Sequence, residues 1–142
     1  MYLILFVPEN NSIIGSNPLI TIDISNNLNL KELFIDGSIS YNFNSLDLTN
    51  NTELTALYCN NNTNISKLDV TNNTKLTSLY CSSTQISKLD VTNNTELTFL
   101  SCSSTQISEL DVTKNTKLTT LRCHYTQISV SYTHLRAHET GY

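Results

Sequence analysis

Apolar residues recur at fixed intervals over most of the chain, and the residues between them are polar. The segment Leu76 to Cys81 reads Leu-x-x-Leu-x-Cys. Its last part, Leu-x-Cys, alternates as a β-strand does, so both of its apolar side chains point to one side. Ile86 follows after a short polar interval, and Leu89 and Val91 come next in a Leu-Asp-Val segment. One unit of this pattern therefore supplies six apolar residues that point inward.

The unit is an internal repeat of nearly constant length. Four copies begin at Leu46, Leu68, Leu89 and Leu110, and a looser, slightly longer copy begins at Ile22. A single copy cannot bury its own apolar residues, but copies stacked at strand spacing form one continuous core. The repeat therefore predicts a solenoid.

The predicted fold is a β-rich, right-handed solenoid with a parallel sheet on one face and short strands or turns on the return side. We expect a short strand or bridge at Leu-Asp-Val, and a turn or one helical turn at Asn-Asn-Thr-Glu-Leu. Residues 22–129 are predicted to form about five coils. Residues 1–21 are predicted to form a decayed first coil or an N-terminal cap.

The repeat resembles the leucine-rich repeat, whose short consensus is Leu-x-x-Leu-x-Leu-x-x-Asn-x-Leu. Cysteine at the third apolar site and Leu-Asp-Val on the return resemble a bacterial, internalin-like subtype. That resemblance implies a binding protein that is secreted or attached to the cell surface. The consensus asparagine is Asn62 or Thr63 in one coil and becomes Thr84, Thr105 and Thr126 in the next three. Because threonine can donate and accept hydrogen bonds, a polar ladder is expected to survive there in weaker form.

Stacking aligns four cysteines in one column, Cys59, Cys81, Cys102 and Cys123. A metal or disulfide interpretation competes with that of buried, unreactive thiols. Ile35 occupies the same site in the first copy, which indicates a site for a small apolar side chain. Zinc requires ligands that converge from different directions, whereas these thiols would run parallel. We therefore expect buried free thiols, no metal and no cofactor.

Two polar columns flank the turn of each copy. An outward aspartate column consists of Asp23, Asp47, Asp69, Asp90 and Asp111. It suggests either a calcium ladder or Asx-type turns, and the turn is favoured because a glycine-rich calcium loop is absent. An asparagine column consists of Asn27, Asn51, Asn73, Asn94 and Asn115. We interpret it as local turn chemistry, because asparagine tolerates left-handed backbone and bonds its own turn.

The outer face of the predicted sheet carries aromatic residues. One outward column contains Phe34, Tyr58, Tyr80 and then Arg122, and Phe99 lies one column away. Exposed aromatic side chains on a rigid sheet provide contact area at little entropic cost, so these five residues are the candidate binding site. The alternative is that cross-strand aromatic pairs only stabilise the sheet.

Composition and charge argue against several classes of function. The net charge of −4 and the absence of clustered Lys or Arg argue against nucleic-acid binding. The apolar start "MYLILFV" lacks a basic segment and a cleavage site and is too short to span a membrane. No catalytic constellation is found, because His124 has no nucleophile to pair with. The sequence predicts a non-enzymatic scaffold that binds a protein or glycan ligand, or alternatively a structural spacer without a ligand.

The pattern breaks after Ser129. Residues 130–142 contain His134 and His138 at helical spacing, with Glu139 beside them. A cap would need an apolar face, and a metal site would need a third ligand. "VSYTHLRAHET" resembles a translated reading frame of a transposon-based sequencing adapter, so this tail is predicted to be non-native. The natural gene is then expected to continue with further Leu-Asp-Val repeats, which makes the chain a fragment.

Overall fold

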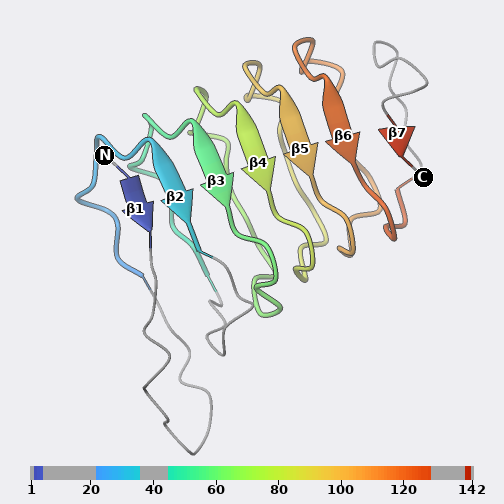
Figure 1. Cartoon of the computed structure of the whole chain (residues 1–142), viewed down its shortest axis with the longest axis horizontal. Coiled ribbons are helices and arrows are strands. Elements are labelled where there is room, and N and C mark those ends of the chain that lie inside the picture. The colour runs from blue at the N-terminus through green and yellow to red at the C-terminus, as the bar shows by residue number, and fades with distance from the viewer. Residues whose placement is uncertain (1, 5–21, 36–44, 129–139, 142) are drawn as a thin grey trace, which may run out of the picture.

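The computed structural model describes residues 2–4, 22–35, 45–128 and 140–141, and these form one parallel sheet along a solenoid (Figure 1). The sheet order follows the chain order from β1 to β7 without a crossover. The strands are β1 (Tyr2–Ile4), β2 (Glu32–Phe34), β3 (Ala56–Tyr58), β4 (Ser78–Tyr80), β5 (Phe99–Ser101), β6 (Thr120–Arg122) and β7 (Thr140–Gly141). No helix occurs among the described residues, and the chain completes about four turns between β2 and β6. The predicted fold class is confirmed.

The strands pair in the register of the sequence repeat. Leu33 lies beside Leu57, Leu57 beside Leu79, Leu79 beside Leu100, and Leu100 beside Leu121. Because the repeat length is nearly constant, each coil brings the same repeat position next to its equivalent in the preceding coil. This register places equivalent side chains of successive coils next to one another.

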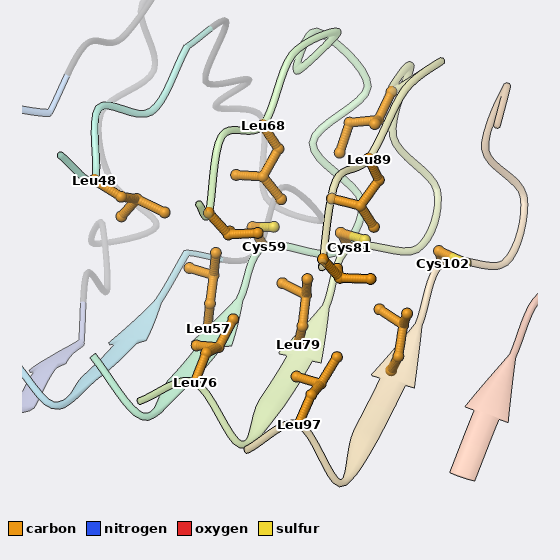
Figure 2. Close-up of a cluster of buried hydrophobic side chains, with 14 of the residues drawn as sticks. Leu48, Leu57, Cys59, Leu68, Leu76, Leu79, Cys81, Leu89, Leu97 and Cys102 are labelled. Carbon is orange, nitrogen blue, oxygen red and sulfur yellow. The ribbon is translucent and has the colours of Figure 1, made fainter. Parts of the chain in front are cut away.

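The interior is a continuous stack of the inward residues of each repeat. Figure 2 shows Leu57 and Leu79 from the strands and Leu68 and Leu89 from the return side pointing into the same interior. The six inward residues of the third copy are all buried, and the central leucines of β2 to β6 are completely inaccessible to solvent. Full burial of such a side chain contributes roughly 1.5–3 kcal/mol, so the core is the main source of stability.

The return side consists of turns. The strand or bridge expected at the Leu-Asp-Val segments does not form in the described residues, whereas the turn expected at Asn-Asn-Thr does. The reason lies in the carbonyl of the valine. The Val70 carbonyl accepts from the Asn73 backbone N–H at 3.0 Å and from Asn94 Nδ2 of the next coil at 3.0 Å, so side chains replace a strand ladder here.

Asparagine side chains join the coils on this side, which corrects their interpretation as local turn residues. Asn94 Nδ2 also donates to the Asn73 carbonyl at 2.9 Å, and each neighbour repeats the arrangement one coil along. We call this set the asparagine ladder; its members are Asn51, Asn73, Asn94 and Asn115, all completely buried. Because the bonds run between coils, the ladder holds successive repeats together and cannot be seen in one repeat alone.

Left-handed backbone occurs at a different position, two residues after the cysteine. Positive φ angles of 54–61° are found at Asn61, Ser83, Ser104 and Tyr125. At the next position, Asn62 Nδ2 reaches the Ile35 carbonyl of the preceding coil at 2.8 Å. Thr84 instead bonds the Cys81 carbonyl of its own coil at 2.8 Å, as do Thr105 and Thr126 with their own cysteines. The weaker ladder expected at these threonines therefore does not link the coils.

A second ladder, which the sequence does not predict, runs across the N-terminal ends of the strands. The hydroxyl of Thr98 donates to the Thr77 carbonyl at 3.0 Å, and Thr55, Thr77 and Thr119 make the equivalent bond to the preceding coil. The sequence signal is the threonine that follows each Leu of the Asn-Asn-Thr-x-Leu turn. The sequence shows that this threonine recurs in four copies, but not that its hydroxyl bonds a carbonyl of the preceding coil.

The predicted tail falls mostly outside the described residues, as do His134, His138 and Glu139. Only Thr140–Gly141 is described, as β7 paired with β6. At the other end, β1 pairs with β2. The assignment of residues 1–21 to a first coil or cap and of residues 130–142 to a non-native tail stays a prediction.

Candidate functional site

The outward residues of the strands form the candidate site. Because side chains alternate along a strand, the residues on either side of each buried central leucine face away from the core. The parallel register stacks these outward residues into columns, and each of the five predicted binding residues lies on this outer face. The five residues therefore share one face of the sheet, and their role in binding stays a prediction.

Four rings form one continuous stack across four coils. Phe34 and Tyr58 have ring centroids 4.2 Å apart and planes inclined by 8°. Tyr58 and Tyr80 are 4.5 Å apart at 16°, and Tyr80 and Phe99 are 4.5 Å apart at 22°. We call these four residues the aromatic stack. Phe99 belongs to the neighbouring column, since it is in register with Ser78, so its side chain continues the stack across the columns.

Arg122 ends the aromatic stack. Its guanidinium carbon lies 5.3 Å from the centroid of the Phe99 ring, within the range of a cation–π contact. In the Arg122 column, β5 offers only Ser101, and that small, buried residue leaves room for the Phe99 ring. The structure thus brings all five predicted residues into one contiguous row.

The hydroxyl of Tyr58 titrates differently from an exposed phenol. Burial raises the pKa of Tyr58, and the neighbouring Tyr80 and the carboxylate of Glu32 add to the effect. Each of these causes disfavours the phenolate. Tyr58 is therefore neutral at physiological pH and can donate a hydrogen bond to a ligand.

The column beside the stack is fixed by bonds between coils. Asn60 Oδ1 accepts from the Ser82 backbone N–H at 3.0 Å, and Ser82 Oγ accepts from the Ser103 N–H at 3.2 Å. Ser103 Oγ accepts from the His124 N–H at 3.1 Å. These small polar side chains extend the hydrogen-bonding of the sheet beyond the strands. The sequence shows that these residues are polar and face outward, but it does not reveal their hydrogen bonds, because each partner lies one coil away.

The cysteine column consists of free thiols, as expected. Cys59, Cys81 and Cys102 are completely buried, and Cys123 is half-buried. Burial raises the pKa of Cys59 and of Cys102 to about 12. A thiol with such a pKa has almost no thiolate at neutral pH and is a poor nucleophile or metal ligand.

The aspartate column forms Asx-type turns, which confirms that interpretation. Asp90 Oδ1 accepts from the Thr92 backbone N–H at 2.9 Å and from the Thr92 hydroxyl at 2.7 Å. These bonds favour the ionised carboxylate and lower the pKa of Asp90, and the same two bonds lower the pKa of the other four aspartates of the column. Among the described residues, no group of three or more His, Cys, Asp or Glu side chains is placed to hold a metal ion.

Two hollows of about 390 and 530 Å³ lie on the return side of the solenoid. Lys88 lines both of them, with Asp90 and Glu109 in the first and Asp69 in the second. They lie on the opposite side of the coil from the aromatic stack, and neither is lined by an aromatic or a buried polar side chain. In the described part of the chain, no helix is long and apolar enough to cross a lipid bilayer.

Comparison with solved structures places the fold among bacterial internalins. The functional domain of InlJ from Listeria monocytogenes, which includes a cysteine ladder, matches with a TM-score of 0.68 and 34% identity over 82% of this chain. The internalin InlF from Listeria monocytogenes matches with a TM-score of 0.62 and 25% identity over 75% of this chain. The match covers only 27% and 32% of those two chains. No family model and no curated protein matches the sequence.

Proposed function

We propose that this internalin-like leucine-rich-repeat chain is a binding scaffold that engages a protein or glycan ligand through the outer face of its sheet. The observation that carries the proposal is the aromatic stack, which crosses four coils on the outer face of the sheet with each ring half-buried. The proposed contact residues are Phe34, Tyr58, Tyr80, Phe99 and Arg122. No catalytic role is proposed.

Three features support a binding role. The rings are held in place by one another and by a sheet in strict register, so little side-chain entropy is lost on binding. Tyr58 and Tyr80 bring hydroxyl groups to the face, and tyrosine is enriched at binding hot spots. Most of the other outward residues of the strands are small, among them Ala56, Ser78 and Thr120, so the row of rings stands out from its surroundings.

The setting of this scaffold is part of the proposal. Its likeness to InlJ and InlF supports a bacterial protein that is secreted or attached to the cell surface. Because the match spans only a minor part of those two chains, we propose that this chain is one part of a longer protein. The partner of the whole protein is left to experiment.

A structural spacer is the second candidate, and the ring contacts themselves favour it. Each aromatic pair contributes about 0.5–1.5 kcal/mol beyond its buried area, so the stack also stabilises the sheet. A repeat array can hold another domain at a distance without binding a ligand of its own. The experiment must therefore separate loss of binding from loss of fold.

The test uses two variants of the same pair of tyrosines. The Tyr58→Phe/Tyr80→Phe protein keeps all three ring contacts and lacks only the hydroxyls, whereas Tyr58→Ala/Tyr80→Ala removes the stack. A random dodecapeptide phage library and a glycan array are probed with each protein, and unfolding is followed by circular dichroism. The binding role predicts ligands that the Ala variant loses and the Phe variant binds more weakly at an unchanged Tm. Ligands that bind all three proteins equally, or none at all, would favour the spacer.

A further inference from the structure

The faces of the central rings of the aromatic stack are closed to a ligand. Tyr58 lies between Phe34 and Tyr80, and Tyr80 lies between Tyr58 and Phe99, at centroid separations of 4.2–4.5 Å. That separation is already that of direct ring contact, so nothing can insert between the rings. The free face of Phe99 is occupied by the guanidinium of Arg122. What these rings offer to solvent is their outer edges and, for the tyrosines, the hydroxyls.

Ring edges and ring faces attract opposite chemistry. The face of an aromatic ring is negative and binds cations or the C–H groups of a sugar, whereas the edge is positive and favours acceptor atoms. With these faces covered, Tyr58, Tyr80 and Phe99 are poorly suited to bind ammonium groups or sugar rings. The edges and the tyrosine hydroxyls favour carbonyl and carboxylate oxygens.

Charge along the face gives this preference a direction. Arg122 is exposed at one end of the row, and no carboxylate among the described residues pairs with it. Glu32 lies at the other end, on β2, four strands from β6 and thus roughly 19 Å away. The Arg122 end attracts an anionic group, and the guanidinium presents a planar fork that fits a carboxylate.

We propose that the occupant of the aromatic stack is an acidic protein segment, one whose Asp or Glu carboxylate binds Arg122 while its carbonyl oxygens lie along the ring edges. This inference rests on the proposed binding function and names the ligand class for the same site. The net charge of the protein is −4, so it would repel an acidic peptide in general. Binding of such a peptide therefore reports a local site.

The composition of the recovered ligands tests the inference. We expect the dodecapeptides selected from the random library to be enriched in Asp and Glu and to require Arg122. Hexaglutamate, hexalysine and cellohexaose are then titrated while the ring proton signals of Tyr80 and Phe99 are followed by NMR. Only hexaglutamate should shift these signals, and raising the salt concentration should weaken its binding.

Matched variants separate a specific contact from general electrostatics. Arg122→Ser, which introduces the residue found in this column at Ser101, should weaken hexaglutamate binding about tenfold. Arg122→Lys keeps the charge without the fork and should fall between. Lys67 lines the second hollow on the return side, so Lys67→Ser removes one positive charge far from the stack and should leave hexaglutamate binding unchanged. Equal losses in the Arg122 and Lys67 serine variants would overturn the inference.

The binding function and the acidic-segment inference fail on different results. Ligands that require the aromatic stack but prove to be glycans or basic peptides would overturn the acidic-segment inference and leave the binding function standing. If neither the peptide library nor the glycan array yields a ligand that requires the stack, both proposals fall. Hexaglutamate binding that shifts the Tyr80 and Phe99 signals and depends on Arg122 supports both.

Discussion

Removing one member of the asparagine ladder should weaken the contact between two coils. In the wild-type protein, Asn94 Nδ2 donates to the Val70 carbonyl at 3.0 Å and to the Asn73 carbonyl at 2.9 Å, and the side chain is completely buried. The Asn94→Ala variant loses both bonds and leaves a small cavity where the amide was. Because the ladder is the main side-chain link on the return side, this change tests how the coils are held together.

The magnitude follows from the partners that remain. Each hydrogen bond contributes about 1 kcal/mol net, and the cavity adds on the order of 1 kcal/mol. Both carbonyls keep a backbone donor at 3.0 Å, from Asn73 and Leu76 respectively, so neither is left bare. We therefore expect Asn94→Ala to lower the free energy of unfolding by about 2–4 kcal/mol. Asn94→Asp should lower the free energy of unfolding further, because it places a carboxylate, which can only accept hydrogen bonds, against two carbonyl oxygens.

The adjacent residue provides the control. Asn93 is exposed and donates a longer bond of 3.2 Å to the Thr71 carbonyl, and Lys114 occupies its column in the next coil. Asn93→Lys should change stability by less than about 0.5 kcal/mol. Urea and thermal unfolding followed by circular dichroism compare the variants, at about 2–4 °C of Tm per kcal/mol. An Asn94→Ala protein as stable as Asn93→Lys would refute the role assigned to the ladder.

Thiol reactivity, acid stability and the source gene provide three further tests. With a thiol reagent, Cys123 should react first and the three buried cysteines only on unfolding, because burial raises their pKa and blocks access; rapid reaction of all four would contradict this. The pKa of Asp90 is lowered below its ordinary 3.8, so its turn stabilises the fold above that pH and loses this stabilisation as the pH falls through the lower folded value; Asp90→Asn should reduce the acid sensitivity of unfolding, and added calcium should leave the Tm unchanged. A genomic sequence of the source locus should continue after Ser129 with Leu-Asp-Val repeats, and one that continues natively into Ser-Tyr-Thr-His would show that the tail is genuine.

Several features were accessible from the sequence because they belong to a single repeat. The strands, the six inward residues and the turn at each aspartate depend on neighbours close by in the chain, such as Asp90 and Thr92. The nearly constant period of the repeat then determined the stacking, because only one register superimposes the apolar positions of all copies. The burial of the cysteine column could be predicted in the same way, because Ile35 occupies the equivalent position and indicates an apolar site.

What the sequence could not supply are the contacts made between coils. A single repeat predicts that each asparagine bonds within its own turn, yet Asn73 and Asn94 bond carbonyls 21–25 residues earlier in the chain. For the same reason, the sequence predicts strands at the Leu-Asp-Val segments, because it does not reveal the asparagine side-chain amides of the next coil that bond the valine carbonyls.

The candidate site likewise has features that the sequence predicts and features that only the tertiary structure shows. The sequence determined by itself that Phe34, Tyr58, Tyr80, Phe99 and Arg122 face outward, because alternation along a strand and a constant period require it. Only the tertiary structure decided that Phe99 crosses to the Tyr80 ring and that Arg122 covers Phe99, since these contacts depend on side-chain rotamers across neighbouring strands. Ring faces closed by their neighbours are a property of that packing, and they determine which chemistry the exposed edges can recognise.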